Sequence, residues 1–323
     1  MLVRSKSTNL DGAIRLTCPP ERCARRRKPD PTYNNQTASR DATRVRRDIA
    51  RLFDGYPARR IVLAPGVLSS LRHLFSVLGV ERLALTAEEY YAPRHFPAIQ
   101  VSCTPASAVL AQIRKSRPQA VVVSVVSWRG EPLPVAEIFA EIRAQSARAP
   151  LLVADYTHAG AIGFPPMTAL NADLVCGDPE KWLLPRGPSK LGFLWMGSPA
   201  LFRVARAAFA PLFLAVDAPA DPRSARWVDP LEVGRIARWL TDARLTRRKL
   251  EARHQGNLRM KRVLAETLGI DSGGESSVIW TTARIPTPLR RRLESLGLIW
   301  RAGTHTRILC RAEIDSVDDV AHD

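Results

Sequence analysis

The chain has 323 residues, 46% of them hydrophobic, so it can bury one large core or a large domain with a smaller one beside it. It contains no apolar stretch of the ~18 residues that a membrane helix requires, and residues 1–18 lack the apolar core of a signal peptide. We therefore expect a cytoplasmic protein without a membrane segment. The five cysteines form no Cys-x-x-Cys pair and no His/Cys spacing typical of zinc, which argues against a disulfide framework and a metal site.

The formal net charge is +17, and residues 1–60 hold 15 Lys and Arg against 6 Asp and Glu. Such an excess is found in nucleic-acid-binding surfaces and in solvated basic arms. No aromatic residues interleave the densest run, residues 25–28, and no nucleic-acid motif follows it. We therefore favour a basic mobile arm over residues 1–30, which are polar and aperiodic, and do not expect nucleic acid as a partner.

After the arm, strand-like and helix-like segments alternate. Apolar residues recur at helical spacing from Thr43 to Phe53. The predicted strands cover residues 61–64, 83–86, 99–102, 120–126, 151–154, 173–176 and 191–195, and the predicted helices between them cover 68–78, 109–113 and 135–142. This alternation predicts an α/β domain over residues 31–225, a mostly parallel sheet sandwiched by helices.

The pattern changes after Pro199. Residues 231–268 form one long helical stretch rich in arginine, and a strand is predicted over 276–284. A helix over 288–296 and a short strand over 306–310 follow. Residues 226–323 are therefore predicted to form a long helix and a smaller C-terminal α+β domain.

An acid and a lysine follow two neighbouring predicted strands. Asp155 comes directly after the strand 151–154, and Lys181 comes four residues after the strand that ends at Gly177. Because ligands of open α/β sheets bind at the carboxyl ends of the strands, both side chains should project from the same edge. Pyridoxal phosphate (PLP) needs a lysine amine to form a Schiff base and a carboxylate to keep its pyridine nitrogen protonated. A capping acid and a surface lysine explain each residue alone, but explain the pair less well.

Several short segments around this pair match a known pattern. They are residues 155–160 (Asp-Tyr-Thr-His-Ala-Gly), 171–173 (Asn-Ala-Asp), Gly177 with 181–183 (Lys-Trp-Leu), 185–187 (Pro-Arg-Gly) and 193–194 (Phe-Leu). In these segments the chain resembles the class V aminotransferase family, most closely its isopenicillin N epimerase-like and cysteine desulfurase-like branch. The resemblance covers roughly residues 31–323 and is strongest over 150–196. It implies the PLP-dependent transferase fold type I, bound PLP, an amino acid substrate and a homodimer.

The resemblance also implies the residues that hold the cofactor. Gly66, Val67 and Leu68 follow a predicted strand and open a helix, where the family binds the cofactor phosphate on backbone amides. Tyr90, with Tyr91 as second choice, matches the position that stacks on the pyridine ring. His158 matches a polar residue near the cofactor's phenolic oxygen.

Substrate contacts are implied in the same way. Arg307 matches the arginine that binds the substrate α-carboxylate through two hydrogen bonds, with Arg301 and Arg311 as rivals. Asn34, beside Asn35, falls in the N-terminal segment that touches substrate in the family. Trp128 is a further candidate for substrate binding.

The chain also departs from the family. Asp178 and Glu180 stand where a small polar residue and a histidine are common, and an acid beside the phosphate is repulsive. Either these side chains turn away, or Arg186 or Lys190 compensates, or cofactor binding is weak. The family's Gly-Thr pair has no clear match near residues 226–229.

The resulting hypothesis is a PLP-dependent enzyme with Lys181 as its catalytic base, acting through an external aldimine and an α-carbanion. An aminotransferase-type reaction is our first choice, while epimerisation and C–S or β-elimination share the carbanion and stay open. A non-catalytic protein of the same fold is a further alternative. A cysteine desulfurase is disfavoured because residues 301–306 hold no cysteine, so Cys310 would have to reach the site.

Overall fold

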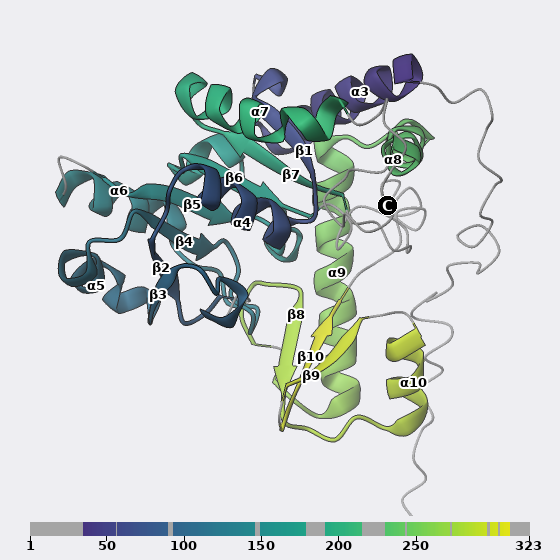
Figure 1. Ribbon diagram of the computed structural model, residues 1–323. Helices are drawn as coiled ribbons and strands as arrows, with labels where there is room; N and C mark the ends of the chain where they lie inside the picture. The colour runs from purple at the N-terminus through teal and green to yellow at the C-terminus, as the bar shows by residue number, and fades with distance from the viewer. Residues whose placement is uncertain are drawn as a thin grey trace, which may run out of the picture.

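The computed structural model shows a large sheet covered by helices, and a small sheet that lies along the long helix α9 (Figure 1). Among the residues it describes, no helix combines the length and the apolar character needed to cross a membrane. The described residues are 35–55, 57–89, 93–145, 149–178, 191–214, 230–242, 244–271, 273–295, 298–302 and 304–310.

The large sheet has seven strands in the order β1-β7-β6-β5-β4-β2-β3. Strands β2 to β6 pair in parallel, whereas β7 pairs antiparallel with both β1 and β6. The mostly parallel sheet is therefore confirmed, with β7 as its one reversed strand, and the carboxyl ends of the other six strands lie at the same edge. The strands are β1 (Ile61–Pro65), β2 (Arg82–Thr86), β3 (Gln100–Thr104), β4 (Ala120–Ser124), β5 (Leu151–Asp155), β6 (Leu174–Gly177) and β7 (Leu191–Met196).

Helices cover both faces of this sheet because its central strands are apolar on both sides. In β4, Val121 and Val123 belong to one core cluster and Ala120 and Val122 to the other, as the two-residue period of a strand requires. The first cluster packs under α3 (Asn35–Phe53), α5 (Val109–Ser116), α6 (Val135–Gln145), α8 (Pro230–Asp242) and α9 (Arg247–Leu268). The second packs under α4 (Val67–Val77) and α7 (Pro199–Leu214).

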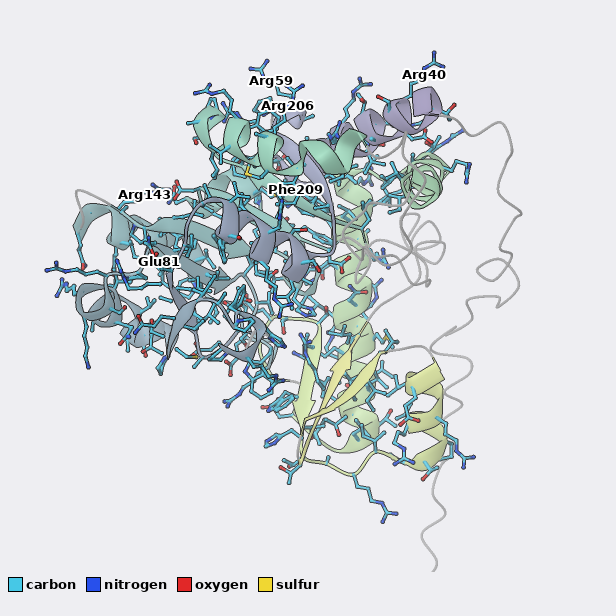
Figure 2. The ribbon with its side chains drawn as sticks, viewed as in Figure 1. Arg40, Arg59, Glu81, Arg143, Arg206 and Phe209 are labelled. Carbon is cyan, nitrogen blue, oxygen red and sulfur yellow. The ribbon has the colours of Figure 1, made fainter. Side chains whose placement is uncertain are left out.

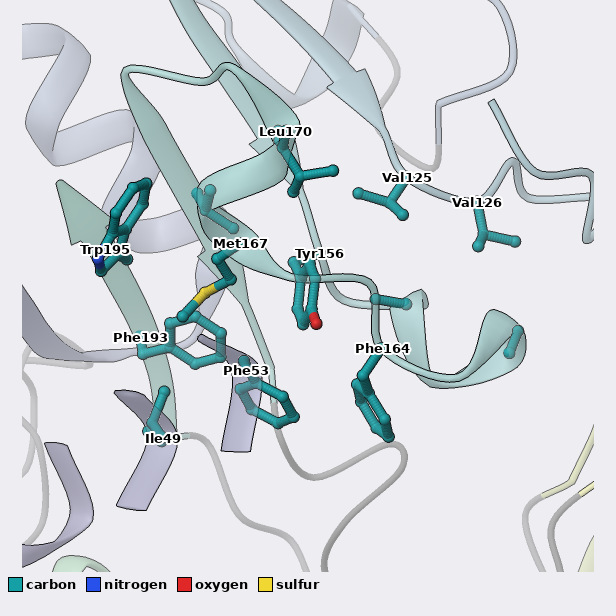
Figure 3. Packing of buried hydrophobic residues seen from close by; sticks show 14 of the residues in the cluster. Ile49, Phe53, Val125, Val126, Tyr156, Phe164, Met167, Leu170, Phe193 and Trp195 are labelled. Atoms are coloured by element: carbon teal, nitrogen blue, oxygen red, sulfur yellow. The ribbon is translucent and has the colours of Figure 1, made fainter. Parts of the chain in front are cut away.

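Aromatic side chains fill the first cluster. The ring of Phe53 in α3 stacks on Phe164 at 4.9 Å between centroids and lies 5.4 Å from Tyr156 (Figure 3).

The surfaces of α3 and α7 that face away from the core carry arginines. Arg40 of α3 and Arg206 of α7 point outward, whereas Phe209 of α7 is fully buried (Figure 2). These two arginines are therefore solvated on helix surfaces.

The small domain is a three-stranded antiparallel sheet in the order β8-β10-β9. It contains β8 (Val278–Thr281), α10 (Thr287–Ser295), β9 (Ile299–Ala302) and β10 (His305–Leu309). The predicted α+β character is confirmed, although the sequence analysis did not predict β9 or the helix α7. Short 3₁₀ helices complete the described elements: η1 (Ala58–Arg60), η2 (Pro93–His95), η3 (Ala106–Ala108), η4 (Ala159–Ile162) and η5 (Met167–Leu170).

The prediction of one long helix over 231–268 is wrong, because two helices, α8 and α9, occupy this stretch. Between them Arg244 adopts a left-handed conformation with φ of 44°. Thr246 then caps α9, since its side chain accepts a hydrogen bond from the amide of Lys249. The break lets α8 pack against α3 while α9 runs on to the small domain (Figure 1).

Candidate functional site

Three polar residues end neighbouring parallel strands at the carboxyl edge of the large sheet. Thr86 ends β2, Ser124 ends β4 and Asp155 ends β5. Ser124 pairs directly with Asp155 in the sheet register, and all three side chains are buried. This edge of an open α/β sheet is where its ligands bind.

Asp155 is only 4% exposed, so its carboxylate belongs to the interior. Its Oδ1 atom accepts a hydrogen bond of 2.8 Å from the amide of Thr157, and the amide of Tyr156 donates to the carbonyl of Cys176. These contacts fix the turn that follows β5. The predicted position of Asp155, at the end of a buried strand, is confirmed.

Glu89 is a second buried carboxyl at this edge, and the sequence analysis gave it no role. It is 6% exposed and accepts hydrogen bonds from the amide and the hydroxyl of Ser124 and from Thr86 Oγ1. Burial raises the pKa of Glu89 to about 8, and the charge of Asp155 adds to this effect, although the hydrogen bonds oppose it. At neutral pH Glu89 is therefore mostly protonated. Glu89 could have been identified from the sequence by the reasoning used for Asp155, namely that polar residues gather where parallel strands end.

The N-terminus of α4 lies at the same edge, directly after β1. Its N-cap residue, Gly66, has φ of 70° and supplies no capping side chain to the first turn. Gly192 of β7 makes room for this turn, since a Cβ atom there would lie 3.0 Å from the Gly66 carbonyl carbon. The amides of Val67 and Leu68 thus open a helix whose dipole favours an anion.

Through Arg307 of β10, the small domain contacts the carboxyl edge of the large sheet. It is 7% exposed, and its Nη1 atom lies 3.4 Å from Nε2 of His158. Because a guanidinium only donates hydrogen bonds, a hydrogen bond between these atoms requires Nε2 to be the acceptor. The amide of Ser277 also donates to the carbonyl of Ala161 at 2.8 Å. The small domain therefore contacts the segment that follows Asp155.

Several predicted site residues fall outside the residues that the structure describes. They are Lys181, Tyr90, Tyr91, Asn34, Glu180, Arg186, Lys190 and Arg311, together with the arm 1–30 and residues 226–229. Of the other candidates, Trp128 lies on the turn after β4, where its ring meets Trp280 of the small domain edge-on. Asp178 is the first residue after β6 and is half-buried.

Cys310 has the environment of a structural thiol. It is fully buried directly after β10, and its amide donates to the carbonyl of Ser277. Burial raises the pKa of this thiol to about 12, although the ammonium of Lys261 opposes the shift. Since the thiolate is the reactive form, Cys310 is a poor nucleophile at neutral pH.

Comparisons with known proteins relate the fold of this chain to a group of solved structures. No family model and no curated protein matches the chain. The cystine C–S lyase C-DES, in complex with its reaction product cysteine persulfide, matches with a TM-score of 0.61 at 17% identity, covering 88% of this chain and 86% of that chain. The cysteine desulfurase CsdA from Escherichia coli matches with a TM-score of 0.56 at 13% identity, covering 88% and 82%.

A putative histidinol-phosphate aminotransferase from Erwinia carotovora atroseptica also matches, with a TM-score of 0.57 at 14% identity, covering 89% of this chain and 90% of that chain. Together these structures show that the chain has the PLP-dependent transferase fold type I. At such identities the likeness concerns the fold alone.

Proposed function

We propose that this protein is a PLP-dependent enzyme that acts at the α-carbon of an amino acid, with a class V aminotransferase-type reaction as the first candidate. The observation that carries the proposal is the buried carboxylate of Asp155 at the carboxyl edge of the sheet. Ligands of open α/β sheets bind at this edge, and a carboxylate at the end of a central strand is suited to hold a protonated ring nitrogen.

The described residues fit the cofactor. Asp155 would hold the ring nitrogen, the amides of Val67 and Leu68 at the α4 N-terminus would bind the phosphate, and His158 would lie near the phenolic oxygen. Lys181, which comes four residues after the end of β6 in the sequence, would carry the cofactor covalently, and Tyr90 would stack on its ring. Bound PLP would supply an electron sink for the substrate's α-carbon.

The remaining residues act on the substrate. Arg307 would bind the α-carboxylate, with Asn34 and Trp128 as further contacts. The amine of Lys181 would move the proton at the α-carbon. The buried, protonated Glu89 holds Ser124 in place without adding a second negative charge beside Asp155.

Transamination, epimerisation and elimination differ in where the proton or the leaving group goes, and all three use these residues. Aminotransferases and a C–S lyase both occur among the solved structures of similar fold. The buried state of Cys310 speaks against desulfuration through that thiol. Epimerisation and elimination are therefore the alternatives to transamination. We further propose a cytoplasmic homodimer, as the family resemblance implies.

An absorbance titration with PLP tests the proposal. The wild-type protein should develop a band at roughly 400–430 nm, which is expected of a lysine-bound cofactor. The Lys181→Ala variant should lose this band, whereas Lys115→Ala, an exposed lysine at the end of α5, should keep it. No band in the wild type would contradict the proposal and favour a non-catalytic protein of this fold.

A screen of amino acids against the loaded protein then separates the reactions. A keto acid formed without release of ammonia indicates transamination, a change of stereochemistry indicates epimerisation, and a keto acid formed together with ammonia, with or without sulfide, indicates elimination.

A further inference from the structure

Two tryptophans from different domains meet beside Arg307. Trp128, on the turn after β4, contacts Trp280 of β8 edge-on, with 4.6 Å between ring centroids and 82° between planes. Trp280 also stacks on His305 of β10, with 4.7 Å between centroids and 7° between planes. All three side chains are only partly buried, so aromatic surface stays accessible at the junction of the two domains.

Backbone hydrogen bonds hold the Trp128 turn in place. The Trp128 amide donates to the carbonyl of Glu88 at 3.0 Å, and the Gly130 amide donates to the carbonyl of Ser127 at 2.9 Å. Gly130 has φ of 95°, and a Cβ atom there would lie 2.5 Å from Cβ of Val278. The turn therefore docks directly on β8, and the indole of Trp128 is held before any ligand arrives.

The register of the small sheet places this surface beside Arg307. Arg307 pairs directly with Trp280 across β10 and β8. Directly paired residues project from the same face, with Cβ atoms about 4.5–5.5 Å apart. An amino acid whose carboxylate is bound by Arg307 would thus have Trp280 within reach of its side chain.

The positive charges at this junction restrict which substrate side chain can bind there. The guanidinium of Arg129 lies 5.1 Å from the ring centroid of Trp128, so a second cation accompanies Arg307 at this junction. A lysine-like or arginine-like substrate side chain would meet both positive charges. A neutral aromatic ring instead gains contact with the two indoles.

We infer that the substrate is an amino acid with an aromatic side chain, and that Trp128 and Trp280 select it. This inference rests on the proposed function, because it places the substrate carboxylate on Arg307. The ring of the substrate packs against the two indoles, and Trp280, which the sequence analysis did not identify, is a specificity-determining residue.

The test is a binding titration of the PLP-loaded protein with L-phenylalanine, L-alanine, L-aspartate and L-lysine, followed by the change in cofactor absorbance and by tryptophan fluorescence. L-phenylalanine should half-saturate the protein at a concentration about tenfold or more below that of the other three, the range expected when a ring-sized apolar group is recognised. In Trp280→Ala the ratio between L-alanine and L-phenylalanine should fall to about one, while Trp280→Phe should restore most of it.

The outcomes separate the two claims. A Lys181-dependent band without preference for L-phenylalanine, or an unchanged ratio in Trp280→Ala, would overturn the inference and leave the proposed function standing. Absence of the band would overturn both. If Trp280→Ala does not fold, the same ratio is measured in Trp128→Ala and Trp128→Phe, because Trp128 lies on the large domain and contributes the other indole.

Discussion

Glu89 offers a direct test of the buried site through the pH dependence of stability. The substitution Glu89→Gln keeps the shape of the side chain and removes its charge at every pH. The amide oxygen can accept the hydrogen bonds from Ser124 N and Thr86 Oγ1, and the amide nitrogen can donate to Ser124 Oγ. The variant should therefore fold as the wild type does.

The magnitude follows from the pKa of Glu89, which rises from 4.5 to about 8 on folding. Between these values the unfolded chain has lost the proton and the folded protein keeps it, so the folded state becomes less stable as pH rises. The contribution is fully present below about 4.5 and is lost as pH rises through about 8. The slope is about 1.4 kcal/mol per pH unit, or about 3 to 4 kcal/mol between pH 5 and pH 8.

The assay is urea unfolding of wild type and variant at several pH values between 5 and 8. The free energy of unfolding of Glu89→Gln minus that of the wild type should grow by about 1.4 kcal/mol per pH unit. Glu88→Gln is the matched control for the substitution itself, since the Glu88 carboxyl accepts a hydrogen bond from the amide of Ala106 outside the Ser124 cluster. A flat difference for Glu89→Gln would refute the buried, protonated state.

Three further predictions concern packing and thiol chemistry. Gly130→Ala should lower the free energy of unfolding by about 3 kcal/mol because of its φ of 95° and a clash with β8, whereas Gly79→Ala, with φ of 64° and open space, should cost only about 1 kcal/mol; equal losses would contradict the docking of the turn. Lys261→Met should cost about 3 kcal/mol in the same assay, because the Lys261 ammonium bonds three backbone carbonyls at 2.6–2.8 Å; an unchanged midpoint would show that these bonds add nothing. In a thiol-labelling experiment read by peptide mass, the exposed Cys103 should react in the native protein and Cys310 only after denaturation; native labelling of Cys310 would contradict its burial.

The sequence alone located most of the large sheet, because each buried parallel strand is a short continuous run of apolar residues. The apolar run 120–126 predicted a strand, and β4 occupies 120–124 with every residue buried. Asp155 could be placed at a strand end for the same reason. The direction of β7 could not be predicted, since all six of its residues are buried and such a run reads the same either way.

The sequence contains a local signal for the break between α8 and α9, but the helical spacing of the apolar residues masks this signal. Apolar residues continue at helical spacing across the break, so the pattern predicted one helix. Thr246 is nevertheless a good N-cap, and Arg244 takes a left-handed conformation between the two helices, of which α8 packs along α3.

Only the tertiary structure decided which residues meet at the site. Glu89 reaches Ser124, 35 residues later, because strand order places β2 beside β4 and β4 beside β5. Trp128 and Trp280 meet because the turn after β4 docks on β8 through Gly130. Apolar periodicity and polar residues at strand ends are patterns of a few neighbouring residues, so they can be recognised from the sequence. Contacts between distant segments depend on strand order and on how the two domains pack, and the free energy of those arrangements is a property of the whole fold.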